Sequence, residues 1–581
     1  MRKDGLKGKC VDPPVYGLAW VVLSLMPSLA EAQQFKEPPL PPLAIPSVPA
    51  GNFMELRSNH FHSGVDLKTN GATGVPVIAV SDGWVSRIKV SPWGYGLALY
   101  IDHAEGLTTV YGHLERYAED IAEYVLEAQY KQRSFSVDLE VPRGELPVAR
   151  GATIAWSGNT GGSSAPHLHY EVRRTRDQHA LDPEAYGLDL PDSQAPIVRG
   201  IRVYPRDSAS WASPYPGSAV GFPVTGSNGR YSLRPQDLIT ASGEVGFAVH
   251  TIDHYDGSPN TCGVRSLMLF VDEVEVFQVL LSEVDFAETR YANAHMDHGL
   301  FTSNSMHYHR CFRLPNDRSK LYQGASDGWL KVEPDRTYRV RVVISDANEN
   351  TSTVEWVLQG APAREGIDRR GGVTGSRFAW DRDNRFVQPG FRLHIPSGAL
   401  YDDEAIRFAR HTTRSPFLSE RFEVLDATVP LHVAAEVSIQ ADQVPVGLLN
   451  KTVVVRSDVK GRSSPEGGRA SDGWITASTK RFGSFALRVD TIPPKVMAVS
   501  LHSDMRGRSG FTFRVSDELS GLDEWEATLD GQWIVLVYDP RTKTLSHRFD
   551  RFSEGKGERR LVLEVRDERG NTTRVERTFL R

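Results

Sequence analysis

The sequence has no large excess of charge of either sign. Among its 581 residues, 67 are Lys or Arg and 73 are Asp or Glu, so the formal net charge at pH 7 is −6. No strong positive field therefore points to nucleic acid or to anionic lipid as a partner, and we expect no nucleic-acid binding. Partners have to be inferred from particular sites instead.

Long apolar runs are also missing. The most apolar stretch, Tyr16 to Met26, is shorter than the ~20 residues of a membrane-spanning helix. It lies between a basic segment and Ala30-Glu31-Ala32, which fits the small-x-small cleavage pattern of a secretory signal peptide. The basic residues are Arg2, Lys3, Lys7 and Lys9. We therefore predict a signal peptide over residues 1–32 and export to the periplasm, the cell envelope or the medium, with no transmembrane segment after signal removal. A retained anchor is the alternative.

Cysteine is scarce, with three residues. Cys10 would leave with the signal peptide, and it precedes the apolar run, unlike a lipoprotein acylation site. Cys262 and Cys311 would remain in an oxidising compartment. One disulfide and two buried free thiols are both open alternatives for this pair.

The length predicts several domains, about four at ~150 residues per domain. Residues 33–50 form a proline-rich leader that we expect to be extended and poorly packed. Residues 51–190 alternate short apolar strands with Asp-Gly and glycine-rich turns, a pattern typical of an antiparallel β-domain. Between Glu115 and Gln132, however, apolar residues recur at helical spacing, which predicts a helical insertion.

A weak internal repeat organises the rest of the chain. One strand ends at Asp346 and the next opens at Asn350, and the same pattern recurs at Asp567 and Asn571. Such a turn resembles the final hairpin of bacterial immunoglobulin-like domains, where Asp and Asn satisfy turn backbone groups.

A matching earlier element begins at Asp253 in one copy and at Asp517 in the other. The sequence therefore predicts a mainly β protein whose antiparallel first domain is followed by β-modules. These modules are immunoglobulin-like β-sandwiches over residues 195–360 and 492–581 and, between them, a β-module of uncertain type over residues 361–490.

Residues that carry chemistry gather in the first domain. His167 and His169 stand at i and i+2 in a predicted strand, so both imidazoles face the same side. His62, Asp66 and His113 lie upstream. A catalytic zinc site takes three ligands from His nitrogens and carboxylate oxygens, keeps a position open for water and needs a nearby group that transfers a proton. Any one of these motifs alone is explained by a packed or solvent-facing histidine, but their combination favours a metal site.

The segment from Gly51 to about Arg174 resembles the lysostaphin-type, or LytM-type, zinc endopeptidases, which cut peptide bonds in bacterial peptidoglycan. The motifs that carry this resemblance occur in the family's order. They are His62-Ser63-Gly64-Val65-Asp66, Gly74-Val75-Pro76-Val77, Asp82-Gly83-Trp84-Val85, Gly94-Tyr95-Gly96, Tyr111-Gly112-His113-Leu114, Gly158-Asn159-Thr160-Gly161 and His167-Leu168-His169. The resemblance implies nothing about the rest of the chain.

The resemblance implies one Zn²⁺ held by His62, Asp66 and His169, with His113 and His167 close to the metal but not bound to it. Zinc lowers the pKa of its bound water toward ~7. His113 or His167 would take the proton of that water or hold the developing oxyanion, and the sequence does not assign which does which. His60 forms a second i, i+2 pair with His62 but lacks an Asp at the family's spacing. We expect His60 beside the ligands or along the substrate groove, with zinc binding as its alternative.

The leading hypothesis is an exported zinc endopeptidase that acts on peptidoglycan peptides, with the β-modules as spacers or as docking units for a cell-envelope protein. One alternative is a non-catalytic LytM-like activator of another cell-wall hydrolase, and a second is a zinc protease directed at a protein substrate. As a further hypothesis, the helical insertion and the segment Ser134 to Arg150 that follows it wall or lid the substrate groove and narrow the range of substrates.

A second group of histidines could form a structural metal site, but it matches no known motif. We favour scattered loop and strand-face histidines there. Its members are His295, His298, His307 and His309.

Overall fold

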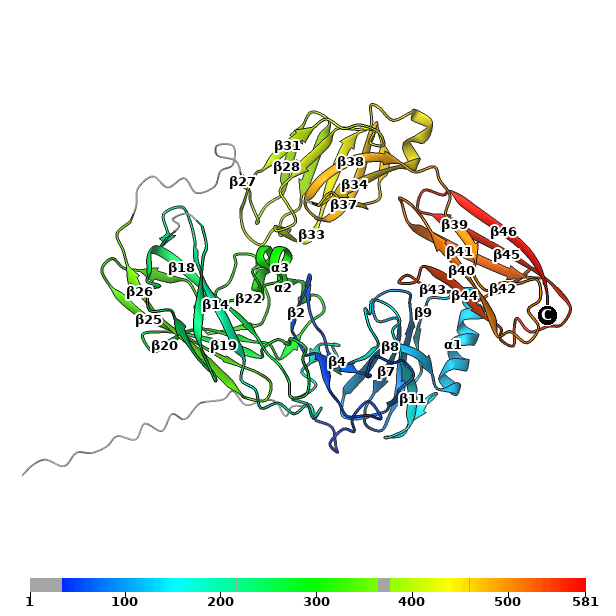
Figure 1. Ribbon diagram of the computed structural model, residues 1–581, viewed down its shortest axis with the longest axis horizontal. Coiled ribbons are helices and arrows are strands. Elements are labelled where there is room, and N and C mark those ends of the chain that lie inside the picture. Colours follow the sequence, from blue (N-terminus) through cyan, green and yellow to red (C-terminus); the bar gives the residue numbers. More distant parts are fainter. Residues whose placement is uncertain (1–33, 215–217, 325, 364–376, 459) are drawn as a thin grey trace, which may run out of the picture.

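The computed structural model describes residues 34–214, 218–324, 326–363, 377–458 and 460–581. The expected signal peptide, residues 1–32, lies outside this range. The prediction of a mainly β protein is confirmed, because strands dominate every part that the structure describes. Figure 1 shows four β-rich units that follow one another around a ring. We refer to residues 34–190, 195–360, 377–490 and 492–581 as the first, second, third and fourth units.

The main sheet of the first unit is antiparallel and positions the predicted site residues. Its central strand β12 lies between β4 and β8. In order across the sheet, the strands are β1 (Pro49–Gly51), β4 (Val65–Lys68), β12 (His167–Arg174), β8 (Leu107–Tyr117), β7 (Leu97–Asp102), β6 (Gly83–Val90) and β10 (Pro147–Val148).

Strand β12 separates the core from the site by simple alternation. Leu168, Tyr170 and Val172 are at most 1% exposed and pack into the hydrophobic core. His167 and His169 point to the other face of the strand. Because one face of β12 is buried against the core, its register is fixed, and with it the position of both histidines.

The proline-rich leader is packed, which contradicts the expectation that it is not. Leu43 is 2% exposed and belongs to the core of the first unit. The leader lies along β5 (Pro76–Ile78), where Ile78 N donates to Pro42 O at 2.9 Å and Leu40 N donates to Val80 O at 2.9 Å. Proline lacks a donor but keeps its carbonyl, so a proline-rich segment can still pair with the N–H groups of an edge strand.

The predicted helical insertion is helix α1 (Glu119–Gln132), which begins after β8 ends at Tyr117. Ile121 and Val125 face the core of the first unit. The opposite side of the helix contacts the fourth unit, beside which it lies in Figure 1. These contacts give no support to the hypothesis that the helix walls the substrate groove.

Tyr130 is the centre of the contact between α1 and the fourth unit. Its ring stacks on Phe552 with centroids 4.1 Å apart, and its hydroxyl donates to Asp550 Oδ2 at 2.8 Å. Arg551 pairs with Glu127 at 2.7 Å and also with Glu123. The last unit of the chain is thereby attached to the first.

The other neighbouring units are joined by specific contacts as well. Strand β13 (Ala180–Leu181) of the first unit pairs with β21 (Glu283–Val284) of the second. Asn316 Nδ2 of the second unit donates to the backbone of the third, to Leu400 O at 2.7 Å. Lys451 Nζ of the third unit donates to Asn571 Oδ1 of the fourth at 2.8 Å.

The second, third and fourth units are β-structures of different construction. The second, from β14 (Ile197–Pro205) to β26 (Thr351–Gly360), forms a 12-stranded sheet. The third is built mainly of two five-stranded sheets, and the fourth, from β39 (Lys495–Ala498) to β46 (Thr572–Leu580), of two four-stranded sheets.

The predicted Asp–Asn turns occur in the second and fourth units. Asn350 donates from N and from Nδ2 to the carboxylate of Asp346, both at 2.9 Å. Asn571 does the same to Asp567, at 2.9 and 2.7 Å. The repeat read from the sequence is thus one turn geometry used twice.

The cysteines and the second histidine group have structural roles. Cys262 and Cys311 are free and buried, so of the two alternatives the structure has the two thiols. His295 Nε2 and His309 Nδ1 lie 3.0 Å apart, and His298 bonds to Thr428 O at 3.2 Å. Within the described residues, these histidines belong to no group of three or more metal-ligating side chains.

No helix in the described residues is long and apolar enough to cross a bilayer.

The ring arrangement yields a prediction about α1. We expect Tyr130→Ala to release the fourth unit from the first, because it removes an aromatic pair worth ~0.5–1.5 kcal/mol and a hydrogen bond to a carboxylate worth ~1.5–3 kcal/mol. Small-angle X-ray scattering should record a larger radius of gyration. Tyr124→Ala is the matched control, because Tyr124 lies on the same helix but contacts Glu145 of the first unit. Identical scattering from Tyr130→Ala and the unmodified chain would contradict the prediction.

Candidate metal centre and active site

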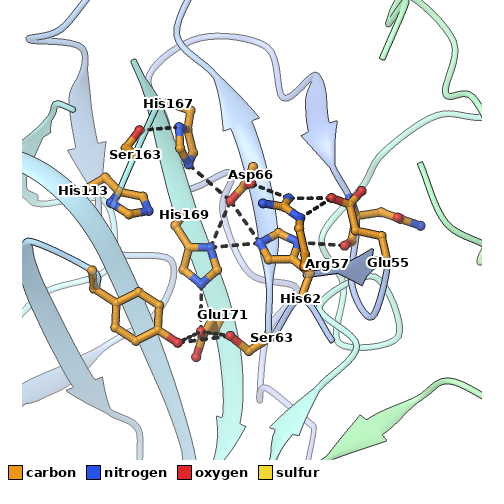
Figure 2. A network of polar contacts seen from close by, with 12 residues as sticks. Glu55, Arg57, His62, Ser63, Asp66, His113, Ser163, His167, His169 and Glu171 are labelled. Atoms are coloured by element: carbon orange, nitrogen blue, oxygen red, sulfur yellow. Dashed lines mark hydrogen bonds and ion pairs between the residues drawn. The ribbon is translucent and has the colours of Figure 1, made fainter. Parts of the chain in front are cut away.

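Three predicted ligands meet beside β4 and β12. Strand β12 pairs with β4 so that His169 is opposite Asp66, and His62 follows β3 (His60–Phe61). His62 Nε2 and His169 Nδ1 lie 3.1 and 2.9 Å from Asp66 Oδ1 and 3.1 Å from each other (Figure 2). All three residues are buried, with 3–6% of their surface exposed. Two imidazoles and one carboxylate therefore meet at a single point on the side of β12 that faces away from the core.

Hydrogen bonds on the far side of each imidazole decide which nitrogen faces that point. His62 Nδ1 lies 2.8 Å from Asn52 O, and His169 Nε2 lies 2.7 Å from Glu171 Oε1. A carbonyl and a carboxylate accept only, so these nitrogens carry hydrogen, and His62 Nε2 and His169 Nδ1 present lone pairs. Lone pairs and a carboxylate oxygen this close repel one another unless a cation or a proton lies among them.

This donor set fits zinc. Zinc takes His nitrogen and carboxylate oxygen, and zinc-bound histidines usually donate their other N–H to a carboxylate or a backbone carbonyl. Without a cation, a proton takes its place. Burial alone would lower the pKa of His169, but its bonds to Asp66 and Glu171 raise it to about 9. Burial would raise the pKa of Asp66, but His62, His167 and His169 hold it well below its ordinary value.

Sequence reasoning missed Glu171 and Arg173, which lie beside the candidate ligands on β12. Glu171 is 0% exposed, and its Oε1 accepts from Ser63 Oγ and Tyr95 Oη, both at 2.6 Å, as well as from His169. Arg173 Nε donates to its other oxygen at 2.6 Å. Burial opposes ionisation, yet Arg173 and His169 hold the pKa of Glu171 far below its usual range. The signal was available, because residues 167, 169, 171 and 173 alternate onto one face of β12.

His113 and His167 flank the three ligands. Their ring centroids are 4.7 Å apart, and the His113 ring is 5.9 Å from that of His169. His113 Nδ1 donates to Thr160 O at 2.8 Å and His167 Nδ1 to Ala165 O at 2.8 Å, so the Nε2 atom of each ring is directed toward the site, that of His167 in contact with Asp66 Oδ1. Burial, His169 and His167 lower the pKa of His113 to about 3. Two proton acceptors thus stand beside the candidate metal position.

The two flanking imidazoles differ in exposure and in backbone. His167 Nε2 is 3.3 Å from Asp66 Oδ1, and its side chain is 15% exposed against 4% for His169, so it faces the open side. His113 has a φ of 59°, an uncommon conformation for a residue other than glycine. It lies where the pairing of β7 with β8 shifts register, and such a bulge re-aims a side chain.

Arg57 occupies the second oxygen of Asp66. Its Nη2 lies 2.8 Å from Asp66 Oδ2, and Glu55 pairs with the same guanidinium at 2.5 Å. Asp66 therefore has one carboxylate oxygen bound by Arg57 and one directed at the histidines.

His60, the alternative ligand, is exposed, and its ring bonds to Ser58 O at 3.1 Å. It is not part of the group formed by His62, Asp66 and His169.

Known proteins share parts of this sequence. The chain matches Peptidase family M23 over residues 60–130 and a Zu5-like domain over residues 375–490. The DD-carboxypeptidase/endopeptidase Mpg of Neisseria meningitidis serogroup B is 33% identical over 137 residues, which are 24% of this chain and 25% of the relative. The peptidoglycan DD-endopeptidase ShyB of Vibrio cholerae is 32% identical over 111 residues, 19% of this chain and 20% of that protein.

Among solved structures, the catalytic domain of lysostaphin from Staphylococcus simulans is 26% identical and covers 24% of this chain and 90% of that one, with a TM-score of 0.18. At that TM-score the overlap carries no argument of its own. The chain spans about a quarter of the length of the first relative. The sequence matches nevertheless identify the first unit as a lysostaphin-type, or LytM-type, peptidase domain, which confirms the resemblance inferred from its motifs.

The network around Glu171 yields a prediction. In Glu171→Gln, we expect zinc affinity to fall ~10–100-fold, because the amide no longer fixes the ring of His169 as a charged acceptor does. Zinc competition with a chromophoric chelator measures the affinity, and circular dichroism confirms folding. Glu145→Gln, an exposed carboxylate of the same domain, is the matched control. A folded Glu171→Gln protein with unchanged zinc affinity would refute this role.

Proposed function

We propose that this chain is an exported, zinc-dependent endopeptidase that hydrolyses peptide bonds of bacterial peptidoglycan. The observation that carries the proposal is the convergence of three ligand atoms and two further imidazole rings in a LytM-type domain. The names of the relatives Mpg and ShyB, both endopeptidases, support the reaction class, and that of ShyB names peptidoglycan.

In this proposal, His62, Asp66 and His169 hold one Zn²⁺. Bound there, zinc would supply a Lewis acid and make water a nucleophile at neutral pH. Glu171 holds the His169 ring in place, and Arg173 neutralises the buried charge of Glu171. The domain thereby presents a fixed set of ligands rather than one assembled by the substrate.

The reaction also needs groups that move protons and stabilise charge. His167 Nε2 and His113 Nε2 can each accept a proton or, once protonated, donate to an oxyanion. Their Nδ1–H bonds to the carbonyls of Ala165 and Thr160 keep both rings turned toward the site. The more exposed His167 stands where a peptide would approach.

The presence of both flanking histidines and all three ligands weighs against the non-catalytic alternative, because degenerate members of the family lose zinc ligands. A protein substrate is the other alternative, because the chemistry of its peptide bond is the same. The second, third and fourth units would then recognise the protein substrate. In the leading proposal, the same units could instead recognise a cell-envelope protein.

Two substitutions on β12 separate metal binding from turnover. We expect His169→Ala to lose zinc and activity, and His167→Ala to keep zinc but lose ~10²–10⁴-fold in turnover, the range of general acid–base catalysis. The measurements are zinc content by mass spectrometry and release of soluble fragments from purified sacculi, with and without a chelator. His60→Ala should keep its zinc.

Full hydrolysis by His169→Ala, or in the presence of chelator, would contradict the zinc assignment. Loss of zinc from His167→Ala would move this residue into the ligand set. Cleavage of a protein substrate but not of sacculi would favour the protease alternative.

A further inference from the structure

A second cluster of buried charged groups lies where the first unit passes into the second. Asp192 comes from the linker between these units, Asp253 follows β18 (Ile239–Ile252), and Asp346 follows β25 (Thr337–Ser345). One carboxylate oxygen from each residue lies within 4.8 Å of the other two. Segments far apart in the sequence thus bring three acidic side chains to one point.

Asp253 is the unusual member of the cluster. It is 0% exposed, yet neither of its carboxylate oxygens accepts a well-aligned hydrogen bond, its one amide contact being a weak one with His254 N, and Asp192 Oδ2 is likewise buried without a partner. A buried carboxylate without hydrogen bonds or counter-charge is strongly unfavourable. Asp346, by contrast, accepts from Asn350, and Asp192 Oδ1 accepts from Gln194 N at 2.9 Å. A bound ligand would supply the interactions that the carboxylate oxygens of Asp253 and Asp192 lack.

The electrostatic surroundings point to a positive ligand. Burial, together with the neighbouring Asp346 and Asp192, raises the pKa of Asp253 to about 8. Burial and the carboxylates of Asp346 and Asp256 raise the pKa of Asp192 to about 6. The carboxylates act on one another as uncompensated like charges do.

The fourth unit supplies an internal comparison. Asp490, the last residue of the third unit, forms a cluster of the same kind with Asp517 and Asp567, which lie at two strand ends of the fourth. The turn asparagines also make equivalent hydrogen bonds to the first aspartate of each cluster. Asn350 Nδ2 donates to Asp192 O at 3.2 Å, and Asn571 Nδ2 donates to Asp490 O at 3.1 Å. The two clusters therefore share one arrangement of three aspartates and an asparagine, each at a point where one unit passes into the next.

The copies differ in how their carboxylates are satisfied. In the fourth unit, Asp517 Oδ2 accepts from the N–H groups of Leu519 and Gly521, and Asp490 Oδ2 accepts from Ser520 N, all at 2.9 Å. In the second unit, the chain after Asp253 instead pairs back through Cys262, whose N and O both bond to Asp253 backbone atoms at 2.8–2.9 Å. Three well-formed amide hydrogen bonds satisfy Asp517 and Asp490, whereas Asp253 has only the weak contact with His254 N.

We propose that Asp192, Asp253 and Asp346 bind a hard divalent cation, with Ca²⁺ the best match. The ligands are oxygens only, which Ca²⁺ prefers and zinc does not. Two oxygens on one Ca²⁺, each ~2.3–2.6 Å from it, lie at most ~5 Å apart, and the observed separations are within 4.8 Å. The ion would tie the linker to two strand ends and fix the peptidase domain on the second unit. This site is separate from the His62–Asp66–His169 group and does not depend on the proposed peptidase activity.

The test is calcium binding by the full chain after metal removal. Isothermal titration calorimetry with CaCl₂ should show a site in the unmodified protein that Asp253→Asn, which is isosteric, weakens at least ~10-fold, because one of the charged ligands is lost. Calcium should also raise the thermal unfolding midpoint of the unmodified protein but not of Asp253→Asn. Asp517→Asn, in the amide-satisfied cluster, is the matched control and should retain the site. If Asp253→Asn does not fold, Asp192→Asn on the half-buried linker provides the same comparison.

Three results would overturn the proposal. One is the absence of calcium-dependent heat or stabilisation in the unmodified chain at about 5 mM CaCl₂, above the ~10⁻⁴–10⁻³ M affinities of extracellular calcium modules. Another is equal calcium affinity in the unmodified protein and the folded Asp253→Asn or Asp192→Asn variant. The third is an equal loss of affinity in Asp517→Asn.

Discussion

The hydrogen bond between His169 and Glu171 is the interaction on which the site depends, because it turns one nitrogen of the central imidazole toward the other ligands. Glu171 can remain charged at 0% exposure because Arg173, Ser63 and Tyr95 donate to it. The strand period of two thus places a proton-transfer candidate, a ligand, an orienting carboxylate and its counter-charge at alternate positions of β12. Since the opposite face of β12 is part of the core, the position of these groups is set by packing rather than by the substrate.

Several buried carboxylates of the described residues are neutralised by neighbouring donors or cations. Glu171 is neutralised by Arg173, and Asp66 by its histidines and Arg57. At the entrance to the fourth unit, backbone amides satisfy Asp490 and Asp517. Asp253 departs from this pattern, and that departure is the reason to place a cation at the entrance to the second unit. The peptidase domain lies between this junction and the contact of α1 with the fourth unit, so these two attachments set its position in the ring (Figure 1).

The sequence predicted those features that are encoded within short stretches of the chain. Strand alternation paired His167 with His169, and the resemblance to LytM-type endopeptidases joined His62, Asp66 and His113 to them; the structure brings these five residues together. The Asp–Asn repeat led to two turns with the same hydrogen bonds. What it did not predict depends on contacts between distant segments. The packing of the proline-rich leader on β5 needs an edge strand whose N–H groups are free, and the position of α1 needs a surface supplied some 400 residues later, at Phe552. The bulge that re-aims His113 and the Zu5-like character of residues 375–490 likewise left no local pattern that periodicity could detect.

The central claim is that His62, Asp66 and His169 together hold zinc in front of two proton-accepting histidines. Anomalous diffraction at the zinc absorption edge from crystals of the purified chain tests it most directly. One strong peak is expected within bonding distance of His62 Nε2, Asp66 Oδ1 and His169 Nδ1, with no atom of His60, His113 or His167 bound to it. A peak elsewhere, or zinc-replete crystals without a peak at these three atoms, would contradict this claim.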